Sequence, residues 1–183
     1  ISVGIGQGYN NFTMLQLASA TATLANNGVK MKPHLIKEVV DIMTHAPTTT
    51  VRETMGEVIA RAENIAVIKK AMVGVNIEGT GAAAFRGAPY TNGGKTGTAQ
   101  VVQIKQGEKY VASRMEERYR DHALFTAFAP AEDPKIALAM IVENAGFGAQ
   151  NSAPIARRVF DFWLLNQYPS EQDIAAVQKA QAP

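Results

Sequence analysis

Apolar residues recur at helical spacing in two stretches of the chain. Before the first, Thr13 and Gln16 form a capping-box pattern, and residues 26–28 supply the left-handed conformation that ends a helix. The expected buried face of this helix is Met14, Leu17, Ala18, Thr21, Leu24 and Ala25. A second amphipathic helix is predicted over residues 63–75. Its stripe is Ile65, Ile68, Met72 and Val75. Residues 79–81 (Gly-Thr-Gly) interrupt this helix, and residues 82–85 can form one further helical turn.

Extended segments are predicted between and after these helices. Residues 29–42 read as extended, and Pro33 restricts them to an edge strand, whereas residues 44–54 are predicted to be a loop. A central strand follows Asn92 and is expected to continue to Ile104. The apolar runs 122–129 and 135–143 are joined by a short turn with a proline at each end, which predicts a hairpin. Residues 108–121 are strongly charged and are expected to form a solvated excursion.

The last predicted helix starts at Asn151 or Ser152. Its stripe, expected to dock on the sheet with Trp163 in the core, is Ile155, Val159, Phe162 and Trp163. Three strands joined by local turns indicate an α+β fold in which an antiparallel sheet is flanked by helices. We assign residues 1–168 to one domain. The Ala- and Gln-rich residues 169–183 are assigned to a tail with no evident function.

Composition narrows the possible functions. With 183 residues, 46% of them hydrophobic, the chain can bury one core. A net charge of +2, spread along the sequence, gives no nucleic-acid footprint. The absence of cysteine excludes disulfides and thiol catalysis, and the three histidines lack metal-ligand spacing. No apolar run is long enough to span a membrane. Because the chain opens on an apolar, glycine-rich segment without Met, we expect it to be part of a longer fold.

The candidate chemistry lies in residues 92–100, Asn-Gly-Gly-Lys-Thr-Gly-Thr-Ala-Gln. A strand edge carrying one cation and two hydroxyls suits an extended peptide that ends in a carboxylate. The backbone would hold the peptide by strand addition, while Lys95 and the hydroxyls would hold its charged end. Lys-Thr-Gly alone also occurs by chance, and a solvated strand lysine is the alternative interpretation.

Several blocks in one order make the chain resemble the class B penicillin-binding proteins, in particular their elongation-specific D,D-transpeptidases. The blocks are Gly6-Gln-Gly-Tyr9, residues 13–18, Lys95-Thr-Gly-Thr-Ala-Gln100, residues 117–122, residues 126–130 and Glu143-Asn144. The resemblance extends to about Trp163. It implies the transpeptidase fold shared with serine β-lactamases, of which this chain is the C-terminal portion.

One departure from the family pattern is large. The family signature combines Ser-x-x-Lys, a Ser-x-Asn triplet and Lys-Thr-Gly. None of the serines here (Ser2, Ser19, Ser113, Ser152 and Ser170) has a lysine three residues later, and there is no Ser-x-Asn. The resemblance therefore implies that the nucleophile, its lysine base and the membrane anchor lie upstream, and that this chain alone is inactive.

The resemblance assigns roles to four residues. Lys95 would attract the substrate's terminal carboxylate and tune the proton relay, and the Thr96 and Thr98 hydroxyls would bind that carboxylate. Gly97 would be small enough for substrate to lie against the strand, and the Thr98 N–H would form half of an oxyanion hole. The implied ligands are peptidoglycan stem peptides and β-lactams, with no cofactor. The implied partner is a membrane glycosyltransferase of the elongation machinery, at the periplasmic face of the bacterial inner membrane.

Other residues carry weaker signals, and other functions stay open. The weaker pairs are Asp121 and His122 at a strand start, Tyr110 and Arg118 in the excursion, and Asn144 and Gly146 in a turn; structural or solvated roles are favoured for all of them. The alternative functions are a serine β-lactamase fragment, a penicillin-sensing binding module and a partner-docking domain.

Overall fold

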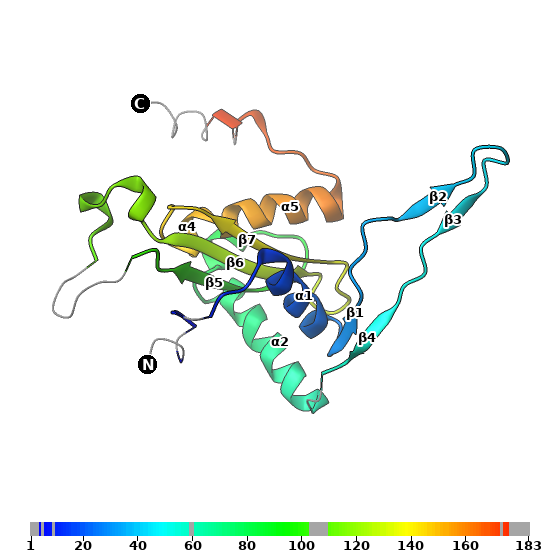
Figure 1. The fold of residues 1–183 in the computed structure, drawn as a ribbon. Helices are drawn as coiled ribbons and strands as arrows, with labels where there is room; N and C mark the ends of the chain where they lie inside the picture. Colours follow the sequence, from blue (N-terminus) through cyan, green and yellow to red (C-terminus); the bar gives the residue numbers. More distant parts are fainter. Residues whose placement is uncertain are drawn as a thin grey trace.

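A three-stranded antiparallel sheet forms the centre of the computed structural model (Figure 1). The structure describes residues 4, 6–8, 10–58, 61–102, 110–172 and 174–175. The strands are β5 (Gly93–Ala99), β6 (His122–Ala129) and β7 (Ile136–Val142), and β6 lies in the middle. The predicted hairpin of β6 and β7 is therefore confirmed, with Ala129 paired to Ile136 beside the turn.

Helices cover both faces of this sheet. Helices α1 (Met14–Ala25) and α2 (Ala62–Ile77) lie on one face, and α5 (Ala153–Leu165) lies on the other (Figure 1). The short helices α3 (Ala82–Phe85) and α4 (Gly148–Asn151) complete the second layer. Its core cluster joins α3, α5 and the sheet: Phe85, Phe125, Ala127, Ala129, Ala153, Ala156 and Phe160. The predicted α+β architecture is confirmed.

The first helix forms as its sequence predicts. The Gln16 side chain accepts a hydrogen bond from the Thr13 N–H at 2.8 Å, and the Gln16 N–H donates to the Thr13 hydroxyl at 3.2 Å, which is a complete capping box. Asn27 and Gly28 have φ values of +56° and +93° at the other end. The left-handed ending is therefore also confirmed.

The second helix is confirmed, but its predicted stripe is only partly buried. Ile65 is buried against Gly28, whereas Ile68 is exposed. The polar Asn76 is buried instead. The C-terminal half of the helix meets the sheet, where Met72 lies against Gly93. This contact explains why the buried face follows Met72 and Asn76 rather than Ile68.

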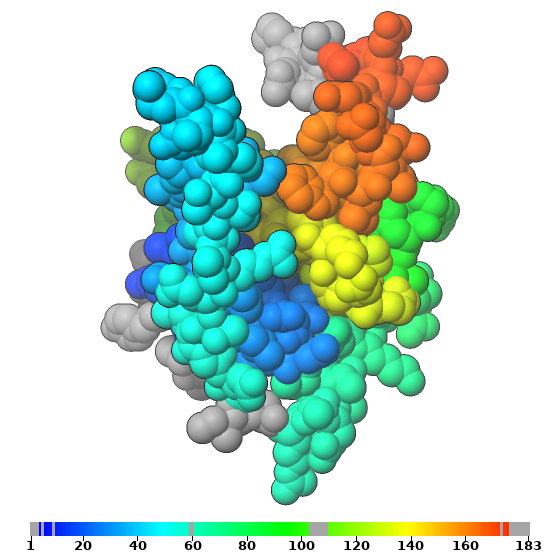
Figure 2. All heavy atoms as spheres, turned by 90° about the vertical axis from the view of Figure 1, so that its right-hand side faces the viewer, coloured from blue at the N-terminus to red at the C-terminus, as the bar shows by residue number. Residues whose placement is uncertain are grey.

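A two-part β arm projects from the body (Figure 1) and faces the reader in Figure 2. Its base pairs β1 (Val29–Met31) with β4 (Thr54–Glu57), and its outer part pairs β2 (Glu38–Val40) with β3 (Pro47–Thr49). The loop predicted over residues 44–54 is therefore interrupted by β3 and ends where β4 begins, whereas residues 44–46 and 50–53 lie outside the strands. Proline is accepted at the start of an edge strand, and threonine favours strands. The arm leaves several large aliphatic side chains exposed: Leu35, Ile36, Val39, Val40, Ile42 and Met43.

The predicted docking stripe of the last helix is wrong. Trp163, expected in the core, is 62% exposed, and the three other members, Ile155, Val159 and Phe162, are exposed as well. The buried face carries Ala153, Ala156 and Phe160. Two alanines let the helix backbone approach the sheet closely, and Phe160 then fills the remaining space. The largest apolar side chains, on which the prediction was based, therefore lie on the neighbouring face of α5.

One predicted boundary differs from the structure and another agrees with it. Strand β5 ends at Ala99 and the chain bends at residues 101–102, so the strand does not continue as expected; Ile104 lies outside the described residues. Helix α5 begins directly after Ser152, as predicted, although the Ser152 side chain makes no capping hydrogen bond.

The excursion before β6 carries two 3-10 turns, at Ala112–Arg114 and Glu117–Tyr119, and an exposed Glu116–Arg118 ion pair of 2.9 Å. Its solvated character is confirmed over residues 110–120, whereas Asp121 is buried. No helix within the described ranges has both the length and the apolar character needed to cross a bilayer.

Close packing explains the glycine pair at the start of β5. A Cβ on Gly94 would lie 2.5 Å from Cζ of Phe125 and 3.0 Å from Nδ2 of Asn76. A Cβ on Gly93 would lie 2.8 Å from Cζ of Phe128. Both glycines are buried. They therefore allow core side chains and α2 to approach the strand.

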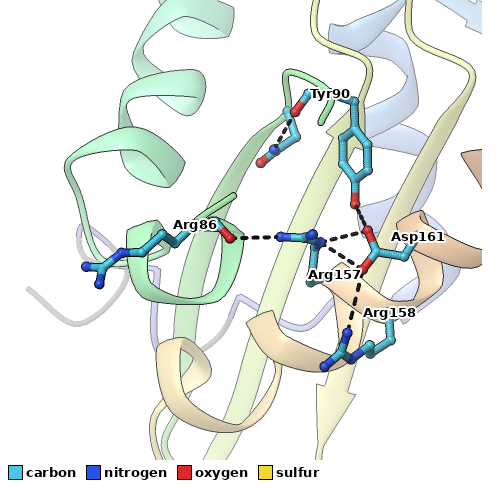
Figure 3. Close-up of polar contacts among 6 residues, drawn as sticks. Arg86, Tyr90, Arg157, Arg158 and Asp161 are labelled. Atoms are coloured by element: carbon cyan, nitrogen blue, oxygen red, sulfur yellow. Dashed lines mark hydrogen bonds and ion pairs between the residues drawn. The ribbon is translucent and has the colours of Figure 1, made fainter. Parts of the chain in front are cut away.

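A buried carboxylate ties α5 to the loop that precedes β5 (Figure 3). Asp161 accepts a hydrogen bond from the Tyr90 hydroxyl at 2.7 Å and pairs with Arg157 Nε at 2.7 Å. Arg157 also donates to the Arg86 carbonyl at 3.3 Å. Burial, followed by the hydrogen bond to Asp161, raises the pKa of Tyr90 above its ordinary value near 10. The neutral phenol is therefore the form that the fold stabilises.

Replacing Tyr90 with Phe should lower the free energy of unfolding by roughly 1.5–3 kcal/mol at pH 7, because a hydrogen bond to a charged group is lost. Because its folded-state pKa is raised, the phenol's contribution is complete below its unfolded pKa near 10 and is lost as the pH rises further. Urea denaturation should therefore show a smaller difference in the free energy of unfolding between wild type and variant above pH 10 than at pH 7. Tyr168→Phe, at an exposed tyrosine, should change little; equal losses in both variants would contradict this account.

Replacing Gly94 with Ala should destabilise the chain by about 1–3 kcal/mol, because the new methyl group overpacks the contact with Phe125 and Asn76. Gly74→Ala is the matched control. It adds a methyl group in the last turn of α2, with no neighbour outside the helix backbone closer than 3.9 Å, and should stabilise by about 0.5–1 kcal/mol. Chemical denaturation measures the free energy of unfolding of both variants. If both substitutions changed it in the same direction, the packing explanation would be excluded.

Candidate functional site

The outer edge of β5 is open along the Lys-Thr-Gly-Thr segment. Strand β5 pairs with β6 on one side, and no strand among the described residues pairs with its other side. The Thr96 carbonyl accepts from Lys95 Nζ at 2.8 Å, and the Thr98 carbonyl accepts from the Gln7 side chain. Both carbonyls therefore point to the open edge. Since the N–H and C=O of one strand residue point the same way, the Thr98 N–H is directed there too.

The four predicted site residues lie together but on two faces of the sheet. Thr96 is opposite Phe125 and Thr98 is opposite Ala123, so both hydroxyls belong to the face that α3 and α5 cover. Lys95 and Gly97 lie on the other face because strand side chains alternate. Lys95 is exposed, and the two threonines are half-buried. The edge thus presents a cation on one side and two hydroxyls on the other.

Packing within the sheet also constrains position 97. A Cβ at this position would lie 3.2 Å from Cβ of Leu124, a tight contact within the sheet. On the neighbouring helix, a Cβ on Gly148 would lie 2.7 Å from the Gly97 carbonyl oxygen. Packing alone therefore accounts for part of the need for glycine at position 97.

The Gln7 side chain closes the far end of the open edge. Its Nε2 donates to the Thr98 carbonyl, and its Oε1 accepts from the Gln100 N–H at 3.2 Å. A primary amide offers the same donor and acceptor as a peptide unit, so Gln7 imitates one residue of an added strand. Gly6 and Gly8 flank it with φ values of +78° and +71°. The Gly-Gln-Gly spacing was the available signal, but the sequence did not reveal this contact.

Thr80 is a second residue that sequence analysis missed. Its hydroxyl oxygen lies 3.0 Å from that of Thr96, so the turn between α2 and α3 contacts the hydroxyl face of the site. The sequence suggested only that glycines 79 and 81 interrupt a helix. A threonine between two glycines gives no further indication of a contact sixteen residues away.

Side chains just before β5 anchor the strand to two other elements. The Thr91 hydroxyl donates to Glu132, in the turn between β6 and β7. Asn92 Oδ1 accepts from Asn76 Nδ2 of α2 at 2.7 Å, and both amides are buried. Only the glycine pair separates these anchored residues from Lys95. The bonds therefore help to fix the position of the Lys95 backbone in the strand.

The weaker candidates have structural roles. His122 Nδ1 accepts from the Asn144 N–H at 2.9 Å, and the Asp121 carbonyl accepts from the Gly146 N–H at 2.7 Å. Asn144 and Gly146 have φ values of +57° and +75°, as their predicted place in a turn requires. The Asp121 N–H donates to the Tyr110 hydroxyl at 3.0 Å. These bonds hold the start of β6 to the end of β7.

The groups at the edge are those that an anionic, extended ligand could pair with. It offers one exposed ammonium, two hydroxyls and backbone groups that can pair with another strand. In the part of the chain that the structure describes, no three His, Asp or Glu side chains converge as a metal site requires.

Comparison with known proteins identifies relatives over nearly the whole chain. The family model described as penicillin binding protein transpeptidase domain matches residues 1–161. The chain is 41% identical to peptidoglycan D,D-transpeptidase MrdA of Haemophilus influenzae over 177 residues, which is 92% of this chain and 26% of that protein. It is 43% identical to MrdA of Acinetobacter baumannii over 171 residues, 91% of this chain and 24% of that protein. The chain thus spans about a quarter of the length of these curated relatives.

Solved structures agree with this relationship. PBP2 of Pseudomonas aeruginosa in complex with WCK 5153 has a TM-score of 0.69 at 36% identity, covering 93% of this chain and 34% of that one. Penicillin-binding protein A of M. tuberculosis, solved as an imipenem acyl-enzyme, has a TM-score of 0.68 at 31% identity, covering 89% of this chain and 33% of that one. The resemblance expected from the sequence is confirmed: the chain belongs to the penicillin binding protein transpeptidase domain family.

Proposed function

We propose that this chain provides one wall of the substrate cleft of a peptidoglycan D,D-transpeptidase, the enzyme that cross-links stem peptides and is acylated by β-lactams. The observation that carries the proposal is the open edge of β5, where Lys95 and the hydroxyls of Thr96 and Thr98 lie within four consecutive residues. The names of the relatives supply the reaction class.

In the proposal, the substrate lies along β5 as an added strand. Lys95 attracts the terminal carboxylate of the stem peptide, and the Thr96 and Thr98 hydroxyls donate hydrogen bonds to it. The Thr98 N–H faces the same edge and serves as one donor of the oxyanion hole, where one such donor contributes roughly 3 kcal/mol of transition-state stabilisation. Gly97 carries no side chain, so that the substrate can lie against the strand at this position.

The covalent step requires a serine beyond these residues, because the chain has no Ser-x-x-Lys sequence. That serine oxygen would form an ester with the penultimate D-Ala carbonyl carbon, and the terminal D-Ala would leave as the protonated amine. The amine of a second stem peptide would then form the cross-link amide and release the serine. A β-lactam would acylate the same serine by opening its ring, and no group would leave.

The setting of the reaction belongs to the same proposal. Residues 1–168 form the C-terminal portion of the transpeptidase domain, and residues 169–183 form a tail. Upstream polypeptide supplies the nucleophile, its lysine and an anchor at the periplasmic face of the bacterial inner membrane, with a membrane glycosyltransferase as partner. The supporting observations are the extent of the family match and the share of the relatives' length that the chain covers.

Fluorescent-penicillin labelling tests the proposed function. In a sample that contains both this chain and the polypeptide upstream of it, we expect one covalent label per site, on a serine outside these 183 residues, by denaturing intact-mass analysis. This chain by itself should remain unlabelled. A label on a serine of this chain, or no label in the complete protein, would refute the proposal. Rapid loss of the label would instead favour a β-lactamase.

Replacing Lys95 with Ala in the complete protein should lower the second-order rate constant of penicillin acylation about 10- to 100-fold. The reason is that a charge-assisted contact contributes roughly 1.5–3 kcal/mol. Lys95→Arg keeps the charge and should lose less. Lys70→Ala, at an exposed lysine of α2, is the matched control and should acylate at the wild-type rate. If the Lys95→Ala variant were acylated at the wild-type rate, Lys95 would be a solvated lysine with no part in ligand binding.

A further inference from the structure

The turn between α2 and α3 places one hydroxyl beside the proposed carboxylate site. Thr80 Oγ1 lies 3.0 Å from Thr96 Oγ1, and either oxygen can donate in this pair. Thr80 is exposed and Thr96 is half-buried. The roles proposed above for the Lys-Thr-Gly-Thr segment do not use Thr80.

Close contacts hold the turn that carries Thr80 against the end of α2. The Gly81 N–H donates to the Val75 carbonyl at 2.9 Å, which closes the turn on the end of α2. A Cβ on Gly81 would lie 2.1 Å from Asn76 Oδ1, and a Cβ on Gly79 would lie 2.8 Å from Cα of Val75. Glycines on either side of Thr80 therefore allow the turn to pack this closely against the C-terminal end of α2.

The same Asn76 side chain also contacts the start of β5. Its Nδ2 donates to Asn92 Oδ1 at 2.7 Å and would lie 3.0 Å from a Cβ on Gly94. One buried amide thus touches both the turn that carries Thr80 and the strand that carries Thr96. This packing contributes to the position of Thr80 relative to Thr96, in addition to the bond between the two hydroxyls.

The hydrogen-bond inventory then determines which hydroxyl donates when a carboxylate is bound. A threonine hydroxyl has one proton and two acceptor lone pairs, whereas an ionised carboxylate only accepts. If the Thr96 hydroxyl donates its hydrogen bond to the carboxylate, the bond between the two threonines can persist only when the Thr80 hydroxyl donates to Thr96. The result is a directed chain from the Thr80 hydroxyl through the Thr96 hydroxyl to the carboxylate, in which each bond polarises the next.

We propose that Thr80 is a positioning residue for carboxylate recognition: its hydroxyl donates to Thr96 Oγ1 and directs the Thr96 proton toward the ligand carboxylate. This inference rests on the proposed function of the β5 edge. It adds a residue from outside the Lys-Thr-Gly-Thr segment, and it makes the α2–α3 turn part of the specificity for ligands with a free carboxylate.

The test uses the complete protein and two probes that differ only at the carboxylate, benzylpenicillin and its methyl ester. Thr80→Val removes the hydroxyl while keeping the shape of the side chain. It should lower the second-order acylation rate constant for benzylpenicillin about 3- to 10-fold, the range of one neutral hydrogen bond. Acylation by the ester should change less than about twofold, because the ester cannot accept the same charge-assisted bond.

Two further variants complete the experiment. Thr80→Ser keeps a hydroxyl and should restore most of the benzylpenicillin rate. Thr48→Val, at an exposed threonine of the arm, should acylate as wild type does with both probes. Thermal unfolding of each variant checks that the fold is retained.

Several results would overturn the inference. They are a Thr80→Val variant that matches wild type with benzylpenicillin, an equal loss with both probes, and a Thr80→Ser variant no better than Thr80→Val. In each of these cases wild type still labels, so the proposed function stands. A wild-type protein that is not acylated by benzylpenicillin would overturn the proposed function, and this inference with it.

Discussion

The position of β5 depends on hydrogen bonds made by three consecutive side chains ahead of it. Tyr90 bonds to Asp161 of α5, Thr91 bonds to Glu132 in the β6–β7 turn, and Asn92 bonds to Asn76 of α2. These partners lie in both helical layers and at one end of the sheet. A strand held in this way can leave its outer edge without a neighbouring strand and still keep its geometry, which is what a ligand-binding edge requires.

The open edge and the packed interior are two consequences of the same residues. Glycines 93 and 94 bring core phenylalanines and α2 against the strand, so the segment that follows starts from a fixed point. The backbone groups of Thr96 and Thr98 then face outward, where an extended peptide can pair with them. Gln7 already uses one of these positions with its side-chain amide. The chemistry proposed for the site therefore follows from which edge of β5 has no neighbouring strand among the described residues.

Local sequence signals predicted the fold well where a pattern decides the structure. Three features could be predicted because neighbouring residues determine them: the capping box at Thr13, the proline-bounded hairpin and the Lys-Thr-Gly-Thr strand. Trp163 was misplaced because burial depends on which helix face fits the sheet, and two alanines allowed the closer approach. Thr80 and Gln7 could not be predicted as site residues, since each meets β5 through contacts between segments far apart in the sequence.

The central claim is that the outer edge of β5 binds an anionic peptide end, and a crystal structure of the complete protein acylated by benzylpenicillin tests it most directly. The account predicts the ligand carboxylate within hydrogen-bond distance of the Thr96 and Thr98 hydroxyls, with the acyl oxygen facing the Thr98 N–H. An adduct whose carboxylate lies elsewhere, with this edge of β5 unoccupied, would contradict it.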